Sequence, residues 1–428
     1  MSGQRVTLGR LWALMLTVLV DMLGFLIVVP LLPFYATRLG ASPLFVGLMA
    51  SAFAVAQLAT APYWGKLSDR RGRRPMLMIG ISISAGAHLL FALACSSWAM
   101  HRFDSRGLIA LLFLSRLIQG AGGATTGVVQ AYVADAIVPE ERAKALGWIS
   151  AATSAGVMVG PALGSLGSLL GAAAPGLIAA ALCVVNLVFA KRYLQESSTA
   201  AERARAAEGD GRSLRHRMFE VAFHPLRPVA RLIWIYAVPM MAFMAMNAVL
   251  ALLLQARFGF TEKTIGVVYI FVGSISLVMR SLVLGPAARR LGERGIMRAG
   301  LLSLAIGFAA QSLAHHLALF ALSILFIPIG TALLFPATTS LVSRYAERHE
   351  LGVTMGVQQA FGGVARLFGP AWAGAAFQLW GPGAPFQISA ALAVLTLVYA
   401  LGLEPPPRVD VARTMVAKAG VSDAAAGT

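Results

Sequence analysis

The sequence has little charge, and acidic charge is the scarcest. Charged residues make up 12% of the 428 residues and hydrophobic residues 58%, and only 18 side chains are Asp or Glu. Soluble domains carry about 25% charged residues, so this composition excludes a soluble protein and predicts an integral membrane protein. The shortage of acids leaves a formal charge of +17, which in a soluble chain would suggest nucleic acid as a partner.

Cysteine is scarce as well. Cys95 and Cys183 both fall in apolar runs, which excludes a disulfide framework and a metal-ligand spacing, so we expect packing residues, no metal and no cofactor. No nucleophile-base pair or phosphate loop is evident, so we do not expect an enzyme. Arg5 and Arg10 precede the first apolar run as in a signal peptide, but that run continues to about residue 36 without a small-residue cleavage site. It is interpreted as the first membrane span.

Long apolar runs are what the chain has in abundance. Twelve reach the roughly 18 residues that a helix needs to cross the hydrocarbon core, and uniformly apolar runs of this length favour helices over barrel strands. We therefore predict an all-α membrane protein with twelve transmembrane helices. The approximate limits are 11–36, 44–66, 75–96, 108–134, 142–171, 174–194, 232–257, 263–288, 296–315, 317–343, 351–379 and 384–403.

The basic residues alternate between the two sides of this topology. Of the 35 Lys and Arg, 27 fall in the termini and every second loop, 5 in the opposite loops and 3 within spans. By the positive-inside rule both termini are cytoplasmic, and the basic excess is explained without nucleic acid.

The spans fall into two groups of six. A polar segment at 191–231, interpreted as a flexible cytoplasmic linker, separates an N-terminal half (1–190) from a C-terminal half (232–404), and 405–428 is predicted to be a disordered tail. The spacing Gly40 to Gly47 equals Gly259 to Gly266, and Gly147 to Pro161 equals Gly356 to Pro370. The halves therefore look like sequence repeats.

One loop carries the strongest motif. Between the second and third spans the chain reads GKLSDRRGRRPML, and a degraded copy, GPAARRLGERG, follows the eighth span. The glycines permit a turn and close approach of helices, and the aspartate can pair with an arginine of the same loop. The pattern consists of Gly65, Leu67, Asp69, Arg70, Gly72, Arg73 and Arg74.

This loop resembles the signature loop of the major facilitator superfamily. The resemblance implies two pseudo-symmetric six-helix halves with a substrate site between them. It also implies that the loop, with Asp69, Arg73 and Asp135, latches the cytoplasmic ends of the halves, the aspartate facing the start of the eleventh helix. The alternative from the residues alone is that the arginines anchor the loop to anionic lipid.

Two ionisable residues lie deep in apolar helices. Asp21 stands ten residues beyond Leu11, about 15 Å along a helix, and Arg116 lies within the fourth span; buried charges in membranes are functional candidates. The run from Arg116 through Gly120 is similar to the superfamily's proton-coupling motif. The surroundings of Asp21 are similar to the first helix of tetracycline and multidrug antiporters. A fixed buried ion pair is the alternative for Asp21.

The fifth span carries a glycine-proline run. Gly156, Gly160, Pro161 and Gly164 thin and bend the helix, and the run is similar to the motif of drug:proton antiporters, with Ser165 where a second glycine usually stands. Arg366 in the eleventh span either contacts an anionic group or pairs across the halves. Further candidates for the substrate cavity are Gln57, Gln119, Asn247 and Gln358.

The resemblance identifies a twelve-helix drug:proton antiporter. It implies a monomer in the cell membrane, such as a bacterial inner membrane, that exports small amphipathic or cationic compounds in exchange for protons. The acids that tetracycline exporters carry in the third and ninth helices have no counterpart here. The alternatives are a metabolite uptake symporter or facilitator, and a non-transporting receptor or scaffold.

Overall fold

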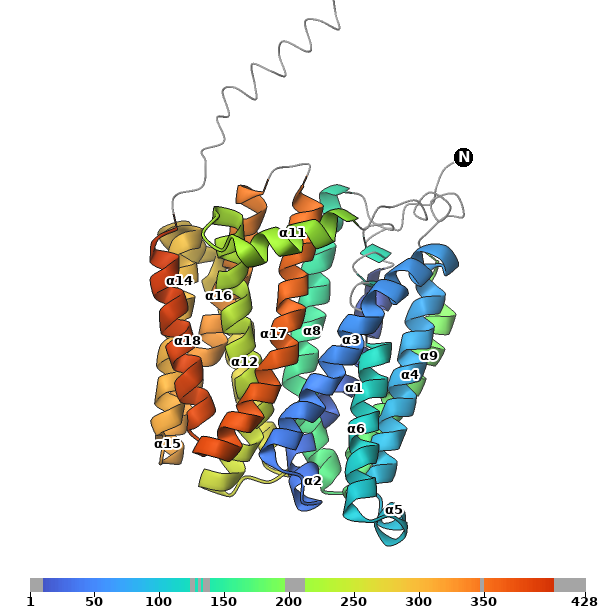
Figure 1. Ribbon diagram of the computed structural model, residues 1–428. Coiled ribbons are helices and arrows are strands. Elements are labelled where there is room, and N and C mark those ends of the chain that lie inside the picture. Colours follow the sequence, from blue (N-terminus) through green and yellow to red (C-terminus); the bar gives the residue numbers. More distant parts are fainter. Residues whose placement is uncertain are drawn as a thin grey trace, which may run out of the picture.

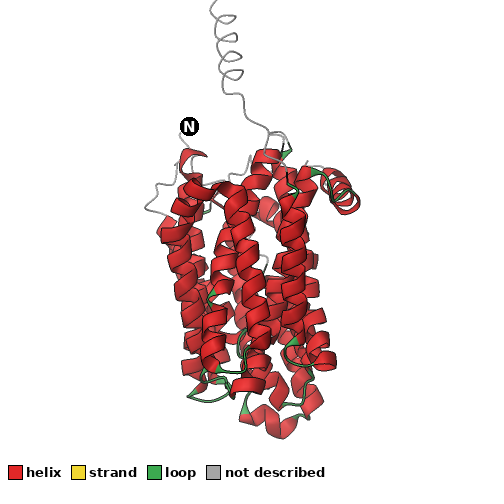
Figure 2. Ribbon diagram, turned by 90° about the vertical axis from the view of Figure 1, so that its left-hand side faces the viewer, coloured by secondary structure: helices red, strands yellow, loops and turns green. Residues whose placement is uncertain are grey.

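The chain folds into a bundle of long helices. The computed structural model describes residues 11–123, 128–129, 132–133, 139–196, 212–346 and 350–403, and these residues form helices and short connections without a strand (Figures 1 and 2). Asp135 lies outside the described residues.

Each predicted span overlaps a helix or two helices in succession, and most of the span predicted at 108–134 beyond Gly122 lies outside the described residues. Prolines explain the broken first span, because Pro30 lies in the short turn between its two helices and Pro33 lies in the first turn of the second helix. The first six spans correspond to α1 (Leu11–Val28) with α2 (Leu32–Arg38), α3 (Pro43–Arg71), α4 (Arg73–Ala94), α6 (Ser105–Gly122), α8 (Pro139–Ser168) and α9 (Ala174–Tyr193), with the short α5 (Ser97–Arg102) before α6. The other six correspond to α12 (Pro228–Phe258), α13 (Ile265–Val278) with the π-helical η2 (Met279–Val283), α14 (Leu284–Leu313), α15 (Leu317–Ile324) with α16 (Phe326–Tyr345), α17 (Leu351–Trp380) and α18 (Ala384–Leu401).

Eight stretches of the described chain are long and apolar enough to cross a membrane by themselves. One of them, Ile265–Leu313, contains the eighth and ninth predicted spans, which are separated by a sharp turn at Gly292. Helices α6, α8 and α17 fall below this criterion. All three are rich in small residues, which are typical of helix contacts in membranes.

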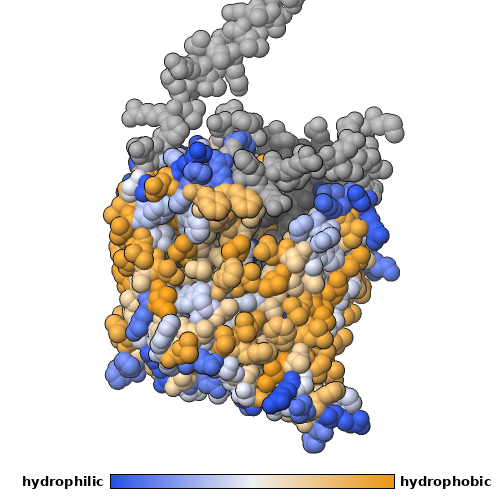
Figure 3. Space-filling model, in the orientation of Figure 1, coloured by the Kyte–Doolittle hydropathy of each residue, from blue (hydrophilic) through white to orange (hydrophobic). Residues whose placement is uncertain are grey.

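The surface has the distribution expected for a membrane protein. Figure 3 shows hydrophobic residues over the middle of the visible face and hydrophilic residues gathered at its two ends. The linker contributes α11 (Arg212–Phe223), which lies across the end of the bundle where the N-terminus is marked (Figure 1). Sequence analysis did not predict this helix.

The halves contact each other through equivalent glycines. A Cβ on Gly47 of α3 would lie 2.2 Å from the carbonyl oxygen of Pro370 in α17, and a Cβ on Gly266 of α13 would lie 2.8 Å from Ser165 Oγ in α8. Only glycine permits so close an approach. The two equal spacings in the sequence thus place equivalent glycines in equivalent contacts, as expected for repeated halves.

These contacts lie at the end of the bundle opposite the signature loop. Near the same end, Ser51 Oγ donates to the carbonyl oxygen of Leu367 at 2.6 Å. Arg38 pairs with Glu262 at 2.6 Å. Towards the loop end, a Cβ on Gly65 or Gly352 would meet no atom within 4 Å. Helices α3 and α17 are thus in close contact near Gly47, whereas no described residue comes within 4 Å of a Cβ at Gly65 or Gly352.

Candidate functional site

The glycine-proline run of α8 holds the helix that carries Asp21. A Cβ on Gly156, Gly160 or Gly164 would lie 2.7 Å from Met22 Cβ, 2.8 Å from Leu26 Cβ and 2.2 Å from the carbonyl oxygen of Ile27, respectively. The stripe therefore packs directly against α1, and it leaves no space for larger residues. This motif fixes the position of α1 inside the N-terminal half.

The opposite face of α1 turns towards α9 and α4. Thr17, Asp21 and Gly24 follow helical spacing on this face. The Asn186 amide of α9 donates to the carbonyl oxygen of Thr17 at 3.0 Å. A Cβ on Gly24 would lie 3.4 Å from Cys183 Sγ and 3.7 Å from His88 Nε2. Asp21 lies between these contacts and interacts electrostatically with Cys183, so it faces the interior of its own half.

A second part of this polar interior comes from α4 and α6. His88 Nε2 and Gln119 Nε2 are 3.2 Å apart, and both side chains are buried. Arg116 stands one turn before Gln119 on α6, and its guanidinium is 5.9 Å from the ring centre of Phe91. The N-terminal half thus contains the buried His88 and Arg116 and the half-buried Asp21, three ionisable residues from three helices.

Arg116 is buried without a polar partner. It is 2% exposed, and none of its three guanidinium nitrogens has a hydrogen-bond partner among the described residues. It therefore does not pair with Asp21 in this conformation. A cation–π contact contributes about 0.5–2 kcal/mol, whereas an arginine at the bilayer centre costs at least about 2.5–3.5 kcal/mol. The ring of Phe91 does not offset this cost.

The signature loop makes hydrogen bonds and an ion pair within its own half. Gly72 has φ of 104°, which strains any other residue, and a Cβ there would lie 2.4 Å from the Glu196 carboxylate. That carboxylate accepts the backbone N–H groups of Arg73 at 2.8 Å and Arg74 at 3.2 Å, at the start of α4. Negative charge at a helix N-terminus is favourable. Asp69 pairs with Arg73 of the same loop and not with α17.

The degraded copy of the loop has related contacts in the C-terminal half. Gly292 has φ of 69°, and the neighbouring Glu293 accepts from Ser340 Oγ at 2.6 Å and pairs with Arg344 at 3.0 Å. Arg298 donates to the last carbonyl oxygens of α18, much as Arg74 donates to Lys191 at the end of α9. Both loops therefore tie the third helix of their half to its sixth.

The candidate cavity residues lie in different places. Gln57 donates to the carbonyl oxygen of Gly123 at 2.8 Å, and Asn247 to that of Phe243 at 2.8 Å. Gln358 is 0% exposed and donates to Thr339 at 3.0 Å, within the C-terminal half. Arg366 is half-buried and lies beside Tyr236 of α12, which sequence analysis did not single out.

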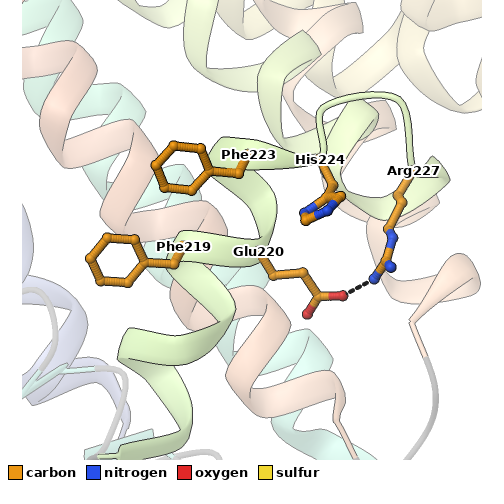
Figure 4. A pocket seen from close by; sticks show the side chains of 5 residues that line it. All are labelled: Phe219, Glu220, Phe223, His224 and Arg227. Carbon is orange, nitrogen blue, oxygen red and sulfur yellow. Dashed lines mark hydrogen bonds and ion pairs between the residues drawn. The ribbon is translucent and has the colours of Figure 1, made fainter.

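A pocket of about 420 Å³ lies on the linker. It is bordered by an ion pair between Glu220 and Arg227, and Figure 4 shows the Phe219 and Phe223 rings pointing away from that pair. The rings stack with centres 6.2 Å apart and are 53% and 73% exposed. Exposed apolar rings beside charged groups are typical of a helix at a membrane surface. The pocket therefore belongs to the surface of α11 and not to the interface between the halves.

The fold and this site define a membrane transporter built from two six-helix halves. A family model for the Major Facilitator Superfamily matches residues 14–310 and 274–423, and the chain belongs to that superfamily. It is a multi-pass membrane protein that moves small molecules and is not an enzyme. The predicted resemblance is confirmed.

Similar proteins carry names related to drug transport. Multidrug resistance protein 2 of Bacillus subtilis (strain 168) is 29% identical over 370 residues, which are 86% of this chain and 88% of that protein. Tetracycline resistance protein, class D, of Salmonella ordonez is 27% identical over 367 residues, 84% and 86% of the two chains. The crystal structure of the human organic anion transporter MFSD10 (TETRAN) has a TM-score of 0.67 and 25% identity, covering 92% of this chain and 99% of that one.

Proposed function

We propose that this protein exports small amphipathic compounds, drugs among them, in exchange for protons by alternating access. The observation that carries the proposal is the buried guanidinium of Arg116, which has no polar partner in the described residues. Structural ion pairs satisfy buried charges, so an unsatisfied one favours a functional role. Asp21, in the same half, is the group that binds and releases the proton.

The surroundings of Asp21 and Arg116 support this assignment. The glycine stripe of α8 fixes the Asp21 helix from one side, and α9 and α4 enclose its polar face. Relatives named for multidrug and tetracycline resistance support export. An inward proton gains about 2.3 kcal/mol per 100 mV, which supports a roughly fiftyfold gradient of a neutral substrate. That driving force is sufficient for a resistance pump.

The conformation agrees with the inward-facing state of alternating access. We propose that both termini and the signature loop are cytoplasmic, as the basic residues indicate, so the joined ends at Gly47 and Gly266 are extracellular and the transporter faces inward. The latch of Asp69 then engages only when the cytoplasmic ends close, which agrees with its pairing inside its own loop. One chain contains both halves, so we propose a monomer as the working unit, and we propose a bacterial inner membrane as its location.

The test is substrate-driven proton movement in inverted vesicles with an acidified lumen. Ethidium or 8-anilinonaphthalene-1-sulfonate added outside should enter the lumen and release protons from it. Asp21→Asn should abolish this release, because an amide of the same shape cannot carry a proton. Asp104→Asn is the matched control, since Asp104 caps the exposed start of α6. Full activity of Asp21→Asn would remove that residue from coupling. Proton release that requires substrate in the lumen would indicate a symporter.

Orientation has its own test. In a background lacking Cys95 and Cys183, a cysteine at Ser105 should react with an impermeant thiol reagent on intact cells. A cysteine at Ser213, at the start of α11, should react only after the membrane is opened. Equal labelling of the two positions would overturn the assigned sides.

A further inference from the structure

The middle of α17 presents a positive charge at the boundary between the halves. Arg366 stands fifteen residues from Leu351, the first residue of a 30-residue helix, so it lies near the centre of the membrane. It is half-buried, and it forms no hydrogen bond or ion pair with any described residue. An arginine at this depth requires a counter-charge or water. Because the described protein supplies no counter-charge, an anionic ligand is the natural partner.

A second donor points to the same place. A Cβ on Gly362 would lie 3.6 Å from Arg366 Nη1, 3.6 Å from the Tyr236 hydroxyl oxygen and 3.0 Å from Tyr236 Cε1. The tyrosine is largely buried, and its hydroxyl makes no hydrogen bond to another described residue. The Arg366 guanidinium and the Tyr236 hydroxyl, two donors without an acceptor among the described residues, therefore lie on either side of the space above Gly362. A larger residue at Gly362 would fill that space. A guanidinium and a hydroxyl together suit a carboxylate or sulfonate.

The surroundings of these donors are apolar and adaptable. Tyr236 packs with Met240 and Ala365, and Met241, Phe243, Met244 and Phe335 pack around them. The Tyr236 and Phe335 rings meet edge to face with centres 5.3 Å apart. Methionine and aromatic side chains fit varied apolar shapes. This cluster is suited to the hydrophobic body of an amphipathic ligand whose acidic group is held by Arg366.

The N-terminal half also lies beside the Arg366 guanidinium. A Cβ on Gly363 would lie 3.1 Å from Leu58 Cδ1 of α3 and 3.9 Å from Arg366 Nη2. The guanidinium thus lies between Tyr236 of the C-terminal half and Leu58 of the N-terminal half. Motion of the halves past each other changes the surroundings of this guanidinium. A ligand bound to it would lie between the halves, as transported substrates do in this architecture.

We propose that Arg366 and Tyr236 bind the acidic group of the substrate, and that the transported compounds are organic acids with an aromatic or aliphatic body. The role of this site in transport depends on the function proposed above, but binding itself does not. The assignment differs from the cationic preference expected from the sequence, because the described face between the halves offers a free cation here.

The experiment compares three probes with one ring system, naphthalene-2-sulfonate, the neutral naphthalene-2-sulfonamide and the cation 2-naphthylmethylammonium. Binding to purified protein is measured by calorimetry and by the shift in melting temperature. The sulfonate should bind at least tenfold more tightly than the other two. Arg366→Gln should remove that preference, Arg366→Lys should keep part of it, and Tyr236→Phe should weaken sulfonate binding by about threefold to tenfold. Arg280→Gln, in the exposed part of α13 and η2, is the matched control and should bind like the wild type.

Two outcomes would overturn the site. One is tighter binding of the ammonium probe by the wild type, which needs no variant and therefore does not depend on whether the variants fold. The other is unchanged sulfonate preference in a folded Arg366→Gln protein. Asp21→Asn should still bind the sulfonate. Sulfonate binding without proton-linked transport would reject the proposed function and leave this site in place.

Discussion

The two halves share a fold but differ in where they keep their charges. The N-terminal half contains the buried His88 and Arg116 and the half-buried Asp21. The buried polar residues that the structure describes in the C-terminal half are neutral, for example Gln311 and Gln358, except for Glu262, which lies near the joined ends of the halves. Its free charge, Arg366, lies at the boundary instead. The difference suggests a division of work in which one half handles the proton and the other holds the substrate.

The halves also differ in the small residues that their equivalent helices α8 and α17 use for packing. Shifting α8 by 209 positions places Pro161 on Pro370, and Gly156, Gly160 and Gly164 on Ala365, Gly369 and Ala373. The glycine stripe is therefore complete only beside Asp21. Small residues let helices approach closely, and here they hold the helix that carries Asp21 in a fixed position. The equivalent stretch of α17 carries methyl groups at Ala365 and Ala373, and a methionine-rich cluster packs around Ala365.

The largest expected effect comes from Arg116→Met. Removing an unpaired buried charge while keeping the volume should leave the melting temperature equal or higher, and proton-driven transport should fall to background. Binding of naphthalene-2-sulfonate should persist. Melting curves and vesicle transport measured on the same preparation check all three outcomes. A clear loss of stability would show that Arg116 has a structural partner, and the contrast between the halves would fail.

A smaller effect is expected from Gly164→Ala. The added methyl group would overlap the backbone of Ile27, and overpacking of this kind costs about 1–3 kcal/mol. Melting temperature and transport should both fall. Gly86→Ala is the control, because a Cβ at Gly86 meets no atom within 4 Å. If both variants melted alike, the stripe would not be the contact that holds α1.

Ser165→Gly should produce a moderate change in conformation. The Ser165 hydroxyl accepts the backbone N–H of Gly266 at 2.8 Å across the halves, and one such bond contributes about 1 kcal/mol. Its loss should shift the population about fivefold towards the outward-open state. The readout is extracellular labelling of a cysteine at Met158, which packs on Gly273 across the halves. Ser168→Gly, whose hydroxyl bonds within α8, should leave the labelling unchanged.

The smallest effect is expected from Arg38→Gln. The Arg38 side chain is 53% exposed, so water and salt screen much of its attraction to Glu262. Labelling at Met158 should increase about twofold in low salt, and the difference from the wild type should disappear in 1 M salt. A salt-independent difference would mean that Arg38 acts through packing and not through charge.

The sequence was sufficient for the family and for the long apolar helices, because apolar length, basic asymmetry and the loop from Gly65 to Arg74 are local signals, whereas the polar helix α11 was not predicted. The spacing of Gly156, Gly160 and Gly164 is also a local signal, and in the structure these glycines approach α1 closely. Contacts between distant segments were not predictable in the same way. Nothing in the sequence indicates that Glu196 accepts hydrogen bonds from the backbone at the start of α4, that Tyr236 lies beside Arg366, or that Arg38 pairs with Glu262. Each of these contacts depends on how separate helices are brought together.

The proposed separation of the two sites has a consequence for adaptation. The methionine and aromatic residues around Tyr236 lie on α12 and α16, whereas the packing that fixes Asp21 involves α1, α8 and α9. Substitutions that reshape the first set do not touch the second. A lineage under selection by a new toxic acid can therefore alter what is carried and keep its energy source intact, and resistance mutations should accumulate in α12 and α16 while the glycine stripe of α8 stays unchanged.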